Sequence, residues 1–271
     1  MPFSKGSLLL VEYTALVKDT NEVIDTTKED EARKHNIYDP SRVYEPRLVS
    51  VGDGWVLKGF DEALLNANLN EEVTVDISPE KAFGVRDQSK VRLIPLRKLG
   101  EKADEVKVGD MVEIDNRVGI VRSITSGRVQ IDFNHRLAGR TITYTFKVLK
   151  QIEDDMEKVT ALIRRRMPVD AGKLGISLNS GMLEVMVPKE YYMQEGLQVI
   201  KRAIANDVFR YVQSVKGIRF VEVYERVEEV KGEEREAGGA GEVQEAGKGG
   251  EEAVQEQQVQ VQAPSPQQPS P

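Results

Sequence analysis

A single short helical stretch set among strand-like segments limits the folds open to this chain more than any other feature of its sequence. In residues 55–67 the apolar side chains, Leu57 and Phe60 among them, recur at the spacing of one helix face. The segments on either side, residues 8–17 and 71–78, have the β-rich, alternating pattern of strands. One short helix needs a sheet to cover its apolar face, so this part of the chain predicts an α+β fold.

A second group of strand-like runs, residues 86–137, has the pattern of an insertion. Its short β runs are separated by Asp-Asn and Ser-Gly turn signals, which predict a small β domain. Residues 138–152 then return to long alternation and are expected to close the sheet begun by the first strands. The first domain is therefore expected in two parts, residues 1–85 and residues 138–152, on either side of the insertion.

The remaining chain divides into a folded part and a tail. Residues 153–230 carry the pattern helix, two strands, helix, strand, which predicts a compact C-terminal α+β domain. Residues 231–271 are rich in Glu, Gly, Gln and Pro and have few large apolar side chains. Such a segment cannot offset the entropy lost on ordering, so a disordered acidic tail is predicted there.

Composition removes several classes of function. The 271 residues are 39% hydrophobic and contain no cysteine, which excludes disulfides and thiol chemistry. Glu12 interrupts the first apolar run too early for a secretory signal, and no stretch approaches the ~20 apolar residues of a membrane helix. A soluble, cytoplasmic protein is therefore predicted. His35 and His135 are too isolated for a metal site, so neither a metal nor another cofactor is expected.

Nucleic acid is not an expected partner either. The net charge is −7, and the mild basic excess of residues 86–137 is interleaved with carboxylates. A nucleic-acid footprint needs a denser basic face than this. The usual motifs of nucleophilic, phosphate-binding and zinc enzymes are also missing from the sequence.

Two ordered motifs point to another chemistry. Residues 56–60 are Val-Leu-Lys-Gly-Phe, residues 79–84 are Pro-Glu-Lys-Ala-Phe-Gly, and Tyr13 and Asp25 precede both. Together they resemble the FKBP family of prolyl isomerases over residues 5–152. The insertion resembles the insert-in-flap arrangement of the SlyD-like branch, and the additional C-terminal domain is similar to the long archaeal members.

The resemblance implies an FKBP-like curved antiparallel sheet wrapped on a short helix, with a prolyl-binding pocket. Phe60 would form the floor of that pocket, and the Leu57 N–H would donate to a substrate carbonyl. Asp25 at the rim would orient a neighbouring side chain or polarise the substrate amide. The implied catalytic residues are Tyr13, Asp25, Leu57, Phe60, Phe83 and Tyr144, with Ile24 and Val56 binding substrate beside them.

Such a pocket would suffice for isomerisation of X-Pro bonds. The bond prefers trans only slightly, but rotation must cross ~18–20 kcal/mol because the amide loses resonance on twisting. A dry apolar site that holds the amide twisted favours the less polar transition state. The reaction then needs neither a nucleophile nor a proton transfer.

Three positions depart from common family residues, and they leave an alternative open. Phe60 stands where Trp is frequent, Phe83 replaces a frequent Tyr and so removes a hydroxyl, and Arg47 stands where some members carry an aromatic residue. Taken singly, each aromatic could be plain core. The alternative function is a non-catalytic holdase with a vestigial pocket.

The insertion is expected to bind unfolded chains, as it does in the SlyD-like branch. Its apolar residues, Val129 and Ile131 included, exceed what a domain of this size must hide, unless they form only its own core. The expected partners are unfolded or nascent polypeptides that contain proline. The C-terminal domain could form a homodimer or a further client-binding arm. The residues predicted to bind clients in the insertion are Leu93, Ile94, Leu96, Met111, Ile120 and Phe133.

Overall fold

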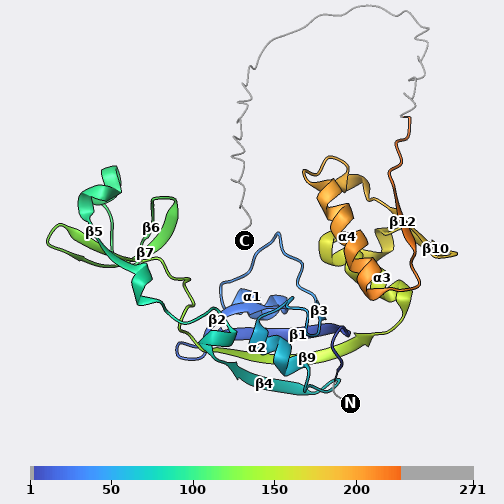
Figure 1. Ribbon diagram of the computed structural model, residues 1–271, viewed down its shortest axis with the longest axis horizontal. Helices are drawn as coiled ribbons and strands as arrows, with labels where there is room; N and C mark the ends of the chain where they lie inside the picture. The colour runs from blue at the N-terminus through green and yellow to red at the C-terminus, as the bar shows by residue number, and fades with distance from the viewer. Residues whose placement is uncertain (1–2, 227–271) are drawn as a thin grey trace, which may run out of the picture. The chain divides into compact units, whose positions relative to one another are not determined.

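Residues 3–226, the part of the chain that the structure describes, form three separate β-sheets with helices packed against two of them (Figure 1). This computed structural model confirms the predicted α+β class. The predicted tail, residues 231–271, lies outside the described residues. Within residues 3–226 no helix is both long and apolar enough to cross a membrane.

The first sheet is antiparallel and combines segments far apart in the sequence. The strand that follows the insertion, β9, lies between β1 and β4, so residues 138–152 do complete the sheet. Alternate side chains of β1 and β9 are buried, as their sequence period predicts. The strands are β1 (Leu8–Val17), β2 (Glu22–Thr26), β3 (Arg47–Ser50), β4 (Glu72–Ile77) and β9 (Ile142–Ile152).

Two short helices accompany this sheet. The predicted helix is α2 (Lys58–Leu64), whose buried Phe60 and Leu64 join the core formed with the sheet. The other, α1 (Glu29–Lys34), lies in the charged segment before β3 and buries only Ala32. Short 3-10 turns occupy Pro79–Lys81, Gln88–Lys90, Leu96–Ala103, Ala171–Lys173 and Lys189–Tyr191.

The insertion folds as a four-stranded antiparallel sheet of order β5-β8-β7-β6. Two-residue turns join its hairpins at Asp115-Asn116 and Ser126-Gly127, and all four turn residues have positive φ. Asn, Asp and Gly tolerate this conformation, which explains why the turn signals located the hairpins. The strands are β5 (Val91–Pro95), β6 (Met111–Ile114), β7 (Arg117–Thr125) and β8 (Arg128–Asp132).

The C-terminal domain has the predicted order of helix, two strands, helix and strand. Its sheet has the order β10-β11-β12, with β12 parallel to β11 after the crossover through α4. Its core also contains Leu8 and Ile152, the ends of β1 and β9, so it packs directly on the first sheet. The elements are α3 (Asp155–Arg166), β10 (Ile176–Asn179), β11 (Met182–Met186), α4 (Leu197–Tyr211) and β12 (Gly217–Val221).

Candidate active site

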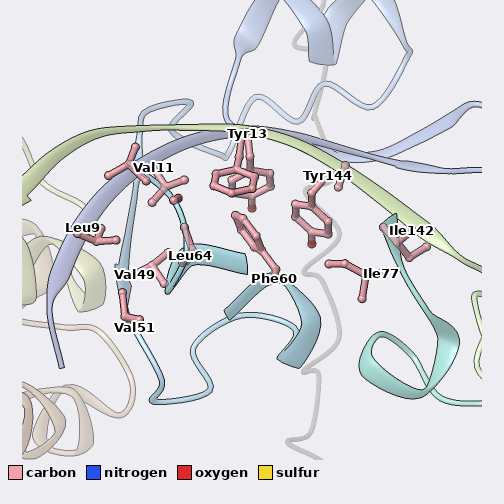
Figure 2. Close-up of a cluster of buried hydrophobic side chains, with 14 of the residues drawn as sticks. Leu9, Val11, Tyr13, Val49, Val51, Phe60, Leu64, Ile77, Ile142 and Tyr144 are labelled. Atoms are coloured by element: carbon pink, nitrogen blue, oxygen red, sulfur yellow. The ribbon is translucent and has the colours of Figure 1, made fainter. Parts of the chain in front are cut away.

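Aromatic rings meet where α2 packs against the first sheet, among them those of Tyr13, Phe60 and Tyr144 (Figure 2). The Phe60 ring stacks on Tyr144 with centroids 4.3 Å apart and meets the rings of Tyr13 and Phe146 edge-on at 5.5 and 5.1 Å. Phe60 has no exposed surface and Tyr13 has 2%. Offset and edge-to-face pairs of this kind contribute about 0.5–1.5 kcal/mol each beyond their area. The cluster is therefore closely packed and largely shielded from water.

Gly59 explains how Phe60 reaches the centre of this cluster. A Cβ atom at Gly59 would lie 2.3 Å from the Cγ2 atom of Ile77 on β4, a distance that real side chains do not adopt. Glycine thus lets α2 lie close against the sheet. Figure 2 shows the result, with Phe60 between Tyr13, Tyr144 and Ile77. The glycine of the sequence motif is a packing requirement.

Partly buried apolar side chains border the ring cluster. They include Phe83, whose ring lies parallel to the His135 imidazole with centroids 4.7 Å apart. Sequence reasoning did not identify His135 as a neighbour of Phe83, because nothing local relates two residues on opposite sides of the insertion. The structure therefore brings the predicted apolar pocket residues to one place. Those at the border are Ile24, Val56, Leu57 and Phe83.

A network of polar side chains hydrogen-bonds the hydroxyl of Tyr13 at the edge of the ring cluster. The Tyr13 hydroxyl donates to Asp25 Oδ2 at 2.6 Å and accepts from Arg47 Nη1 at 2.9 Å. Arg42 Nη1 donates to the other Asp25 oxygen at 2.7 Å. Asp25 thus holds the Tyr13 hydroxyl through a hydrogen bond, and its role in the reaction stays a prediction. Arg42 was missed, since no motif relates this loop residue to Asp25.

The electrostatics of the site keep Tyr13 protonated. Burial, followed by the negative charge of Asp25, raises the pKa of Tyr13 to about 12. Burial likewise raises the pKa of Tyr144, with smaller contributions from Tyr13 and Asp25. Both side chains are neutral hydrogen-bond donors near pH 7.

Two donors beside the rings have no acceptor within residues 3–226. They are the Tyr144 hydroxyl and the backbone N–H of Leu57, which precedes the first turn of α2. No side-chain polar atom in this part of the chain is both buried and unpaired, so the Tyr144 hydroxyl reaches solvent. Both donors are available to a ligand. No group of His, Asp or Glu side chains among the described residues could hold a metal ion.

In the insertion, the structure divides the predicted client-binding residues. Val129 and Ile131, counted from the sequence among the apolar residues that exceed what the insertion must hide, are fully buried in its small core. Leu93 and Met111 are 57% and 74% exposed, and Val118, which sequence reasoning missed, is 59% exposed. The other predicted residues are partly buried. Ile94, Leu96 and Phe133 pack on the insertion's own core, and Ile120 is the fourth partly buried residue.

Three family models match parts of the chain. Residues 2–98 match the family described as FKBP-type peptidyl-prolyl cis-trans isomerase. Residues 92–137 match the family described as FKBP26, IF domain, and residues 155–225 match FKBP26_C-terminal.

The match to each of three relatives spans most of that relative's length. The chain is 35% identical over 144 residues to a short-type peptidyl-prolyl cis-trans isomerase of Methanocaldococcus jannaschii, covering 53% of this chain and 90% of that protein. It is 32% identical over 109 residues to a probable FKBP-type 16 kDa isomerase of Pseudomonas fluorescens, covering 38% and 71%. The SlyD isomerase of Helicobacter pylori is 26% identical over 155 residues, covering 56% and 76%.

Proposed function

Because the chain belongs to the family of FKBP-type peptidyl-prolyl cis-trans isomerases, we propose that the ring cluster around Phe60 and its border form the catalytic pocket. The activity of the family is isomerisation of X-Pro bonds, and proline-containing polypeptides are its substrates. The comparisons give no support to the alternative of a non-catalytic holdase. The proposed catalytic residues are those of the ring cluster and its border.

The proposed pocket acts on the substrate amide through its surroundings. The prolyl ring enters over Ile24, Val56 and Phe83 and packs toward Phe60. Since Phe60 has no exposed surface, it would act as the floor beneath the side chains that the prolyl ring contacts. In this dry site the twisted amide, which has lost resonance, is favoured relative to the planar one.

The two unpaired donors carry this proposal. The Leu57 N–H and the Tyr144 hydroxyl lie beside an apolar cluster and find no acceptor within residues 3–226. Each can donate to a substrate carbonyl and hold the chain on one side of the prolyl bond. The Tyr144 hydroxyl would replace the one that is absent at Phe83. Asp25 acts as a positioning residue through Tyr13.

A protease-coupled assay on an Ala-Leu-Pro-Phe peptide tests the pocket. Wild type should accelerate the cis-to-trans step, and Phe60→Leu, which keeps an apolar side chain, should lose most of the acceleration. Phe209→Leu is the matched control, because it makes the same change at a ring that is 46% exposed on α4. Circular dichroism would verify that both variants are folded. Full activity in a folded Phe60→Leu variant would refute the pocket.

The insertion is proposed to capture client chains. Leu93, Met111 and Val118 expose apolar surface that the small core cannot cover. A client held there presents its prolines to the pocket at a raised effective concentration. Suppression of aggregation of an unfolded protein by wild type, and its loss in a Leu93→Ser, Met111→Ser double variant, would support this role. Equal suppression by both proteins would contradict it.

We further propose that the C-terminal domain forms a homodimer. Met182 and Met186 of β11 lie on the face of their sheet that is not buried against the helices, and they are 45% and 38% exposed. Light scattering of wild type and of a Met182→Ser, Met186→Ser variant tests this, since a monomeric wild type would refute it. The proposed setting is the cytoplasm, with polypeptides rather than membranes or nucleic acids as partners.

A further inference from the structure

A cleft of about 760 Å3 lies between the first sheet and the C-terminal end of α3. One wall comes from the segment that leads into β3, with Arg42 and Arg47, and the other from Arg164, Arg165 and Arg166. Thr27, Ser41 and several apolar side chains also line the cleft. The apolar ones are Leu10, Val43, Pro46, Leu48, Ala161 and Pro168.

The cleft contains more positively charged than negatively charged side chains. The five guanidinium groups share three carboxylates among the described residues, and only two of these, Asp25 and Glu45, line the cleft. A guanidinium carries five donors, so most of the donors remain available. Arg42 and Arg47 share Asp25, Arg164 pairs with Glu45 at 2.7 Å, and Arg165 and Arg166 share Asp207 at 3.4 and 3.0 Å.

Arg165 shows the consequence of this crowding. Its guanidinium lies 3.7 Å over the Trp55 ring, which holds it in place away from bulk water. Burial, then the positive charges of Arg166 and Arg47, lower the pKa of Arg165, although Asp207 opposes the shift. An added negative charge would therefore relieve repulsion among these groups.

The cleft adjoins the proposed catalytic pocket through shared residues. Asp25 and Arg47 line the cleft, and both hydrogen-bond the hydroxyl of Tyr13, whose ring belongs to the cluster around Phe60. A polypeptide chain that leaves the pocket past Tyr13 would thus meet the guanidinium groups. An extended chain advances about 3.3 Å per residue, so a side chain only a few positions from the proline is within reach.

We propose that this cleft is a specificity site for an acidic side chain of the client, a few residues from the proline that occupies the pocket. The inference rests on the proposed function, since it places both groups on one bound chain. Guanidinium groups bind carboxylates through paired, charge-assisted hydrogen bonds, and the apolar walls suit the methylene groups of a Glu side chain. A nucleic acid fits less well, because Asp25 and Glu45 would repel its phosphates.

Paired peptides that differ only in Glu or Gln test this site, with the acidic residue moved through the three positions on each side of the proline. Wild type should give a kcat/KM roughly threefold higher for Glu at the best position, as expected for partly exposed charge pairs. The preference should shrink as salt is raised from 0.05 to 0.5 M. The Gln peptides report the isomerase reaction without the added charge.

Variants then assign the preference to the cleft. Arg164→Gln and Arg166→Gln should each bring the Glu-to-Gln ratio toward one. Glu45→Gln should raise it, because it releases Arg164 from its partner. Arg202→Gln is the matched control, since Arg202 is exposed on α4 and does not line the cleft. This opposite response of two residues in one ion pair is not expected from general destabilisation.

The possible failures are distinguishable. Equal turnover of Glu and Gln peptides by wild type would overturn this inference and leave the proposed function standing. A Glu preference that survives in an Arg164→Gln, Arg166→Gln double variant would also overturn it. If wild type accelerated neither peptide, the proposed function would fail and this inference with it.

Discussion

The first sheet and the insertion both gather apolar side chains, but they differ in how completely they hide them. Seventeen buried residues form the core under α2, where Phe60 is fully covered. Among the described residues of the insertion only five form its core, and Met111 beside it is 74% exposed. A domain as small as the insertion cannot enclose every apolar side chain that its strands carry.

This difference matches two kinds of work. The work proposed for the ring cluster, holding an amide twisted, requires groups fixed in place, and the rings are packed together and tied by the Tyr13–Asp25 hydrogen bond. Holding unfolded chains of varied sequence requires exposed and adaptable apolar surface, for which the flexible methionine side chain is suited. The ring cluster under α2, here called the closed region, is thus expected to tolerate few substitutions. The insertion, here called the open region, is expected to tolerate many.

The largest expected effect is on stability at the centre of the closed region. Phe60→Ala should lower the free energy of unfolding by about 3–5 kcal/mol, because it leaves a cavity among the three remaining rings. Urea unfolding followed by circular dichroism measures this. A loss below about 1 kcal/mol would mean that the cluster is not the packed core described above.

The second expected effect is the contribution of Tyr13 to the pH dependence of the free energy of unfolding. Because the pKa of Tyr13 is raised to about 12 in the folded protein, its contribution is fully present below the unfolded pKa of 10.0. It is lost as pH rises from 10 to 12 and amounts to about 3 kcal/mol. Tyr13→Phe should remove this part of the alkaline loss. Identical curves of unfolding free energy for the two proteins above pH 10 would contradict the assignment.

The smallest expected effect on stability lies in the open region. Met111→Ser should change the free energy of unfolding by less than about 0.5 kcal/mol, since the side chain packs on little. It should nevertheless slow the catalysed refolding of a proline-limited protein, because it removes exposed apolar surface. A stability loss as large as that of a core variant would show that Met111 is structural.

Much of the fold could be predicted because periodicity is local. The strands β1 and β9 and the helix α4 each repeat their apolar residues at the period of the element they form. Burial in the insertion could not be predicted so well. Met111 and Val112 are neighbours in β6, and only the packing of the sheet decides that Val112 is buried and Met111 exposed.

The site divides in the same way. Tyr13, Phe60 and Tyr144 were predicted through the family resemblance, and the structure brings their rings into contact. The contacts of Arg42 and Arg47 depend on how the segment before β3 folds back onto Asp25, which no local pattern encodes. The same holds for Leu8 and Ile152, which end strands of one sheet and pack in the core of the next domain.

The most direct test of the account is to remove the insertion and compare two substrates. The Gly139 N–H donates to the Gly84 carbonyl at 2.8 Å, so a short loop can replace residues 86–136 and keep the buried Leu137. Turnover of Ala-Leu-Pro-Phe should persist, while the catalysed refolding of a proline-limited protein should slow about tenfold or more. If both rates fell together, pocket and insertion would act as one site, which would contradict the account.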